Sequence, residues 1–63
     1  MKFIKINNGY YNPKYITAIE ISKDKQYYFV NIHIIEKPKL SFNFSSFEDA
    51  VKCQEYFVNQ IRQ

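Results

Sequence analysis

The spacing of apolar residues changes at Ser45-Ser46, and this change constrains the fold more than any other feature of the chain. Before it, residues 40–44 alternate between apolar and polar, as a strand with one buried face does. After it, apolar residues recur at every third and fourth position, which places them on one face of a helix: Phe47, Ala50, Val51, Phe57, Val58 and Ile61. The chain is therefore expected to fold as an α+β domain with a C-terminal helix.

Length and cysteine content limit how such a fold can be stabilised. A chain of 63 residues has material for one small core, so residues 1–63 are expected to form a single domain. Cys53 is the only cysteine, which excludes an intrachain disulfide, and Cys53 with His33 cannot complete a structural zinc site. Oligomerisation remains as a source of added stability.

Four strands are expected before the helix, at residues 2–7, 16–22, 27–35 and 40–44. Asn7-Asn8-Gly9 ends the first strand, because Asn and Gly accept the positive φ that a turn needs. Residues 10–13 are interpreted as a connection, since Pro13 cannot donate to a ladder. Short connections favour antiparallel neighbours. These patterns predict a four-stranded antiparallel β-meander followed by one C-terminal α-helix packed on one sheet face.

The start of the helix carries a capping pattern. Either Ser45 with Glu48 or Ser46 with Asp49 satisfies the spacing of a capping box, and acidic residues in the first turn favour the positive end of the helix dipole. Glu48 and Lys52 are four residues apart in the favourable order. Further along the helix, Gln54 interrupts the apolar stripe and is expected to be hydrogen-bonded, while Cys53 is expected to pack as a small hydrophobe and Tyr56 to be exposed.

Alternation along the strands divides the apolar residues between two sheet faces. The face expected beneath the helix, with Phe57 against Phe42 and Ile32, carries Ile19, Ile21, Val30, Ile32, Ile34, Leu40, Phe42 and Phe44. The other face is expected to carry Phe3, Ile16, Ala18, Tyr27, Phe29 and Ile35 beside Asn31 and His33. Because one helix cannot cover both faces, the second face is expected to be a protein interface, used for self-association as a homo-oligomer, through Phe3, Tyr27, Phe29, Asn31, His33 and Ile35. An open sheet edge is the alternative surface for self-association.

One end of the predicted meander gathers tyrosines and basic residues. A possible anionic-partner patch there comprises Tyr10, Tyr11, Lys14, Tyr15, Lys37, Lys39 and Arg62. Aromatic rings that stack on bases and lysines that meet phosphates suggest a binder of single-stranded nucleic acid as an alternative function. The net charge is only +3 and Arg62 is the only arginine, which argues against nucleic acid as a partner.

The residue pattern favours binding over catalysis. Cys53 and His33 are expected on opposite sides of the domain, and Gly9 is the only glycine, so the chain has neither a nucleophile-base pair nor a glycine-rich phosphate loop. We expect no catalytic residues, no metal and no cofactor. The chain also has no apolar run long enough to cross a membrane or to act as a signal peptide, so a cytoplasmic location with no membrane partner is expected.

Residues 12–20, Asn-Pro-Lys-Tyr-Ile-Thr-Ala-Ile-Glu, resemble the Asn-Pro-x-x-Ile-x-x-Ile-Glu stretch of the small bacterial flagellar FlbD/SwrD family. The matching positions are Asn12, Pro13, Ile16, Ile19 and Glu20, and the order of strands and helix is similar. The chain departs from the family at residues 37–39, where Lys-Pro-Lys replaces a Gly-Lys turn. This resemblance implies a non-catalytic accessory protein.

Residues with A- and T-rich codons dominate the composition, which indicates a bacterium or a phage as the source. Together these features predict a non-enzymatic protein-binding module with an accessory or regulatory role. A phage-encoded inhibitor that docks on a bacterial defence protein would show the same features.

Overall fold

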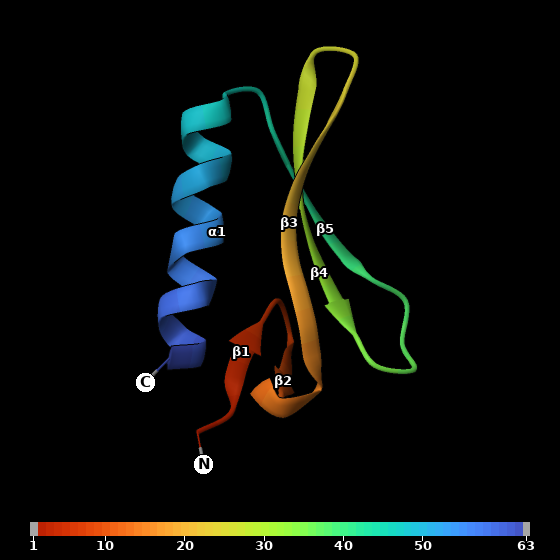
Figure 1. Ribbon diagram of the computed structural model, residues 1–63, viewed down its shortest axis with the longest axis vertical. Coiled ribbons are helices and arrows are strands. Elements are labelled where there is room, and N and C mark those ends of the chain that lie inside the picture. Colours follow the sequence, from red (N-terminus) through yellow and green to blue (C-terminus); the bar gives the residue numbers. More distant parts are fainter. Residues whose placement is uncertain (1, 63) are drawn as a thin grey trace.

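The computed structural model describes residues 2–62 and contains five β-strands, one 3₁₀ turn and one α-helix (Figure 1). In chain order these are β1 (Ile4–Ile6), β2 (Gly9–Tyr11), the 3₁₀ turn η1 (Pro13–Tyr15), β3 (Ile16–Asp24), β4 (Tyr27–Ile34), β5 (Leu40–Phe44) and α1 (Phe47–Arg62). The α+β class and the packing of a C-terminal helix on the sheet are as the sequence predicts.

The strands form two antiparallel sheets, so the prediction of one four-stranded meander is wrong. β1 pairs only with β2, and β3, β4 and β5 form the larger sheet in that order. The cause lies in the turn at Asn7, whose φ of 55° closes a two-residue loop that pairs Ile6 with Gly9. Residues 9–11 therefore form a strand rather than a connection, and the first strand finds its partner within the N-terminal hairpin.

The larger sheet has the predicted division of faces, with one exception at its edge. Ile19 pairs with Ile32, and Ile32 also pairs with Leu40, so these apolar side chains share the helix-covered face. A shift of register lies between Ile16 and Ala18 on β3. Because such a bulge reverses the alternation of side chains, Ile16 packs against the core instead of lying on the opposite face as predicted.

The helix begins as the capping pattern indicates, and the structure selects Ser46 rather than Ser45 as its cap. The Ser46 hydroxyl accepts a hydrogen bond from the Asp49 backbone N–H at 3.4 Å, and the Ala50 N–H donates to the Ser46 carbonyl at 3.1 Å. The Glu48–Lys52 pair forms at 3.5 Å. These contacts fix where α1 starts and therefore which of its residues face the sheet.

Gln54 ties the helix to the sheet edge. Its side-chain amide donates to the Ile19 carbonyl of β3 at 3.0 Å, which confirms the prediction that this glutamine is hydrogen-bonded. The contact gives a backbone carbonyl of the edge strand β3 a side-chain partner. Helix and sheet are therefore held together by a polar contact as well as by apolar packing.

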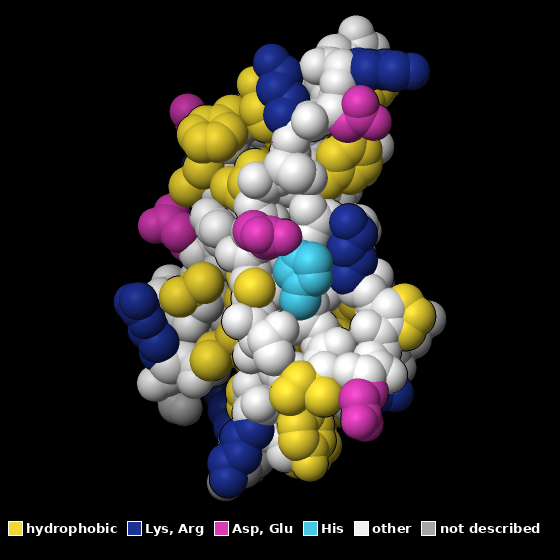
Figure 2. Space-filling view, turned by 45° about the vertical axis from the view of Figure 1, so that its right-hand side comes forward, with side chains coloured by type: hydrophobic (Ala, Val, Ile, Leu, Met, Phe, Trp, Pro, Cys, Tyr) yellow, Lys and Arg dark blue, Asp and Glu magenta, His cyan; other side chains and the backbone are white. Residues whose placement is uncertain are grey.

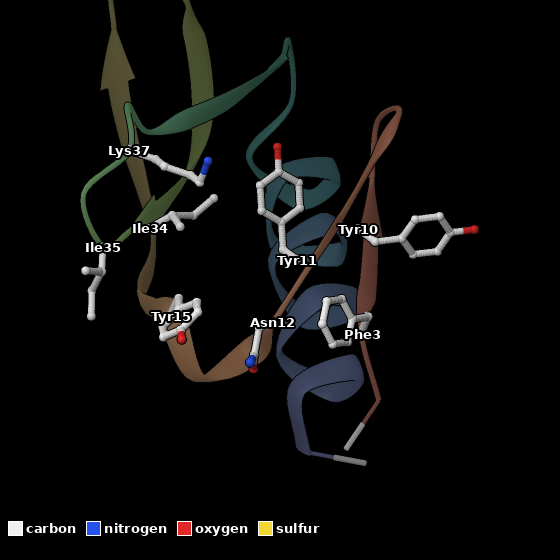
Figure 3. Close-up of a pocket in the computed structure, with 8 residues that line it drawn as sticks. All are labelled: Phe3, Tyr10, Tyr11, Asn12, Tyr15, Ile34, Ile35 and Lys37. Atoms are coloured by element: carbon white, nitrogen blue, oxygen red, sulfur yellow. The ribbon is translucent and has the colours of Figure 1, made fainter.

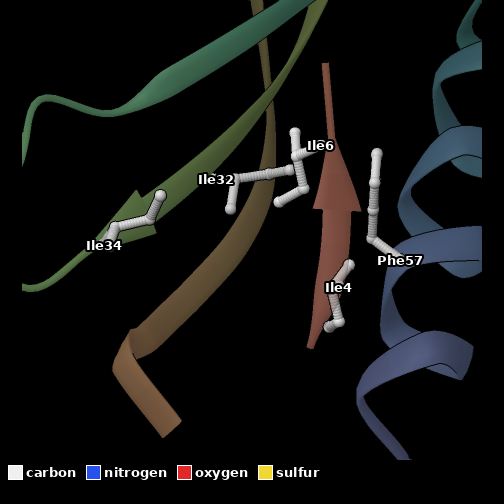
Figure 4. Close-up of a cluster of buried hydrophobic side chains, with 5 residues drawn as sticks. All are labelled: Ile4, Ile6, Ile32, Ile34 and Phe57. Carbon is white, nitrogen blue, oxygen red and sulfur yellow. The ribbon is translucent and has the colours of Figure 1, made fainter. Parts of the chain in front are cut away.

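The N-terminal hairpin completes the core between helix and sheet. Figure 4 shows β1 between β4 and α1, and the main buried cluster comprises Ile4, Ile6, Ile32, Ile34 and Phe57. Phe57 stacks on Phe42 with ring centroids 5.6 Å apart, as its predicted position requires. Ile6 is 1% exposed, so burial of the hairpin is part of the fold. Its position matters for the site, because the hairpin presents Phe3, Tyr10 and Tyr11 beside the end of β4.

Candidate functional site

A pocket of about 410 Å³ opens where the N-terminal hairpin and η1 meet the end of β4 (Figure 3), and we call it the main pocket because more residues line it than line either adjoining depression. It is lined by Phe3, Tyr10, Tyr11, Asn12, Tyr15, Ile34, Ile35 and Lys37. Its size is in the range of sites that hold a small ligand or a few side chains of a partner. The lining is mostly aromatic and aliphatic, with Lys37 as its one charged side chain.

Hydrogen bonds of the backbone hold the walls of the pocket in place. Asn12 caps η1, since its side-chain oxygen accepts from the Lys14 N–H at 3.0 Å, and the Tyr15 N–H donates to the Asn12 carbonyl at 3.0 Å. The Ile35 N–H donates to the Tyr15 carbonyl at 2.9 Å and ties η1 to the end of β4. The Lys37 N–H donates to the Ile34 carbonyl at 3.2 Å and closes the turn that follows. The pocket is therefore formed before any partner arrives.

Exposed apolar side chains are concentrated around this pocket. Seven large hydrophobic residues in the described part of the chain are exposed, and four of them line the pocket. These four are Phe3 (55% exposed), Tyr10 (66%), Tyr15 (56%) and Ile35 (49%). Single exposed apolar residues are ordinary, but a group of them around one cavity is typical of a binding site. We call the region of Phe3, Tyr10, Tyr15, Ile35 and Lys37 the pocket end.

Lys37 lines three adjoining depressions of the surface. Besides the main pocket, it lines one of about 250 Å³ with Tyr11, Ile34, Pro38, Lys39 and Leu40. It also lines one of about 430 Å³ with Tyr15, Ile35 and Glu36. Within residues 2–62 the ion pairs are Glu20–His33 and Glu48–Lys52, so the ammonium of Lys37 is not neutralised by a carboxylate there. It is available to an anionic group of a ligand.

The structure regroups the two predicted sets of site residues. Of the predicted anionic-partner patch, Tyr10, Tyr11, Tyr15 and Lys37 line the main pocket and Lys39 lines an adjoining depression. Lys14 on η1 and Arg62 at the end of α1 line none of the three depressions. Of the predicted protein interface, Phe3 and Ile35 join the pocket, so they lie with the tyrosines instead of on the open sheet face. Asn12 and Ile34 complete the lining and were not predicted as site residues. The place of Asn12 before Pro13 indicates a capped turn, and Ile34 was assigned to the face beneath the helix.

The other predicted interface residues lie on the sheet face away from the helix, and this face is largely polar. Asn31 is 4% exposed. Its amide nitrogen donates to the Ser22 hydroxyl at 2.9 Å, and its oxygen accepts from the Ser41 hydroxyl at 2.7 Å. These bonds join the three strands of the larger sheet. Asn31 is thus a satisfied structural residue rather than a free interface group.

His33 contacts a carboxylate on the same face. Its Nε2 lies 2.6 Å from an oxygen of Glu20, and both side chains are partly exposed. The histidine, cyan in Figure 2, lies beside acidic and basic side chains near the middle of the view. Tyr27, 40% exposed, and the half-buried Phe29 are the aromatic residues of this face. The open face is therefore less apolar than alternation of the sequence suggests.

Cys53 lies apart from His33, as predicted. It packs against the core cluster, where burial raises the pKa of its thiol, while His33 faces the other side of the sheet. Within residues 2–62 no group of three or more metal-ligating side chains comes together. No helix in the same part of the chain is long and apolar enough to cross a membrane.

Comparisons with family models, with curated proteins and with solved structures found no match to this chain. The resemblance of residues 12–20 to the flagellar FlbD/SwrD family therefore stays a prediction.

Proposed function

We propose that this chain is a non-enzymatic protein-binding module with an accessory role, and that a partner protein docks at the pocket end. The observation that carries the proposal is the grouping of four exposed large apolar side chains around one cavity. Burial of such a patch by a partner is favourable, because each square ångström of apolar surface removed from water contributes roughly 25 cal/mol.

The hydrogen bonds and core contacts that hold the walls of the site support this proposal. Three backbone segments form the walls, and each is joined to the next by hydrogen bonds or anchored by the core. The hairpin, for example, is fixed by Ile4 and Ile6, which are 3% and 1% exposed. A partner that binds a preformed site loses little free energy to ordering it. A phage inhibitor of a bacterial defence protein would use the same kind of site, and the identity of the captured protein would distinguish the two roles.

The uncovered sheet face is a second surface, and we propose that a second copy of the chain binds there weakly. Tyr27 and Phe29 would be buried by such a contact. Burial of Glu20 and His33 would remove a polar pair from water, which costs free energy and limits the affinity. The pocket end, with its aromatic and aliphatic lining, is expected to be the stronger site.

Capture from an extract of the native host tests the main proposal. The immobilised full chain is compared with Tyr15→Ala, and with Tyr56→Ala as a matched control, since these two tyrosines are 56% and 57% exposed. We expect the Tyr15 variant to lose a protein that the wild type and the Tyr56 variant retain, with circular dichroism unchanged in both. Equal capture by all three chains would contradict docking at the pocket end.

A further inference from the structure

We propose that the partner segment bound at the pocket end carries a carboxylate flanked on both sides by bulky apolar side chains, and that the carboxylate pairs with Lys37. This inference rests on the proposed function, since it names the chemistry of the segment that docks there. Two features of the site support it: the charge around Lys37 and the arrangement of the three depressions.

The charge of the site favours an anionic group. Lys37 is the only charged residue that lines the main pocket, and Lys39 adds a second cation in the adjoining depression. Glu36 is the one acidic residue among the residues that line the three depressions. Lys5 lies with its ammonium 5.9 Å from the centre of the Tyr10 ring, which adds positive charge near the rim. An acidic ligand is therefore attracted and a basic ligand repelled.

The shape of the site favours apolar groups on both sides of that anion. Tyr11 and Ile34 lie between the main pocket and the smaller depression that ends at Pro38 and Leu40. Figure 3 shows Lys37 extending toward Tyr11 from the opposite side of the pocket. A segment that places its carboxylate at Lys37 thus has an apolar cavity on either side of that contact. Extended peptide fits this arrangement, because its side chains project at regular intervals.

A nucleic acid strand fits the same surface less well. Successive phosphates need a row of cations, and binding of such a strand rests on several contacts with Lys or Arg. Here Lys37 lines the main pocket, Lys39 lines the adjoining depression and Lys5 lies over the Tyr10 ring, while Lys14 and Arg62 line none of the three depressions. Tyr10 and Tyr15 could stack on bases, so an oligonucleotide is included in the test as a competing ligand.

Titrations of the ¹⁵N-labelled full chain with short synthetic peptides test the inference. The probe peptide has a central glutamate, a phenylalanine two positions away on each side, and glycine elsewhere; matched peptides have glutamine or lysine at the centre. We expect the glutamate peptide to shift the amide signals of Tyr11, Tyr15 and Lys37. It should bind about threefold more tightly than the glutamine peptide at low salt, the size expected for one exposed ion pair, and the lysine peptide should bind least.

Variants of lysine locate the effect. Lys37→Gln should remove the preference for glutamate, and Lys37→Arg should keep it. Lys52→Gln, on the exposed side of α1, serves as the control and should leave the preference unchanged. Oligothymidine is titrated against the same chains to test the competing ligand.

Each result supports or overturns the inference. Equal binding of the glutamate and glutamine peptides at the pocket would overturn the carboxylate while leaving the protein-binding function in place. Absence of shifts at the pocket with every peptide would also overturn the inference, and capture of a partner would then decide the proposed function alone. Tight binding of oligothymidine that depends on Lys37, with no peptide bound, would overturn both.

Discussion

Removal of the Phe57 ring should destabilise the domain more than any change on the surface. Phe57 is 8% exposed, contacts the cluster formed by β1 and β4, and stacks on Phe42 of β5 at 5.6 Å. One side chain therefore joins the helix, the hairpin and the larger sheet. Truncation of a buried phenylalanine to alanine costs about 3–5 kcal/mol through lost transfer free energy and the cavity that remains. A core of this size supplies about 3–5 kcal/mol in total. Phe57→Ala is expected to leave most molecules unfolded.

Urea unfolding followed by circular dichroism measures the effect, with Phe57→Leu as a milder change that keeps a folded population. We expect Phe57→Leu to lower the free energy of unfolding by about 1–2 kcal/mol. Tyr56→Leu is the matched control, because Tyr56 is the neighbouring aromatic residue and is 57% exposed. It loses only an edge contact with the Phe57 ring at 5.2 Å, so its cost should stay below about 1 kcal/mol. Equal losses for the two leucine variants would mean that α1 does not present Phe57 to the core.

Three further outcomes are expected. Asn31→Ala should lower the free energy of unfolding by about 1–3 kcal/mol, because two serine hydroxyls lose their hydrogen-bond partner. The control Asn43→Ala, on the same sheet face, should change this free energy by less than about 0.5 kcal/mol, and similar urea midpoints for the two variants would contradict the prediction. Cys53 should react with a maleimide more slowly in the folded chain at pH 8 than in urea, since burial raises its thiol pKa and reduces the thiolate fraction; equal rates would argue against this burial. Phe29→Asp, on the sheet face away from α1, should lower the mass measured by light scattering at high protein concentration without changing the helical circular dichroism signal. A wild-type chain that is monomeric at that concentration would exclude self-association through this sheet face.

Features encoded by neighbouring residues could be predicted from the sequence. The helix start was limited to two capping pairs, Ser45 with Glu48 or Ser46 with Asp49, and the structure has the second; the turn at Asn7 was expected at its observed place. The division of apolar side chains between the two faces of β3, β4 and β5 agrees with their alternation along each strand, except at Ile16. Such signals depend on the backbone preferences and side-chain direction of a few adjacent residues. No distant partner is needed to determine them.

The candidate site was only partly predictable, since its residues come from distant segments. Tyr10, Tyr15 and Lys37 were grouped correctly by the expected meeting of chain connections at one end. Phe3 and Ile35 were assigned to the open sheet face, because alternation along a strand was continued beyond the strand ends. In the structure Phe3 precedes β1, and Ile35 follows β4 and bonds to η1 instead of continuing the sheet.

The sequence by itself determined the α+β class, the start of the helix to one of two neighbouring serines, and the buried face of the larger sheet except at Ile16. Only the tertiary structure decided that β1 pairs outside the larger sheet and fills the space between β4 and α1, where Ile4 and Ile6 complete the core. The position of β1 depends on the volume left between α1 and the larger sheet. Elements far apart in the chain set that volume, so the spacing of apolar residues within residues 4–6 does not indicate it. The same insertion places the hairpin beside the end of β4 and so creates the pocket.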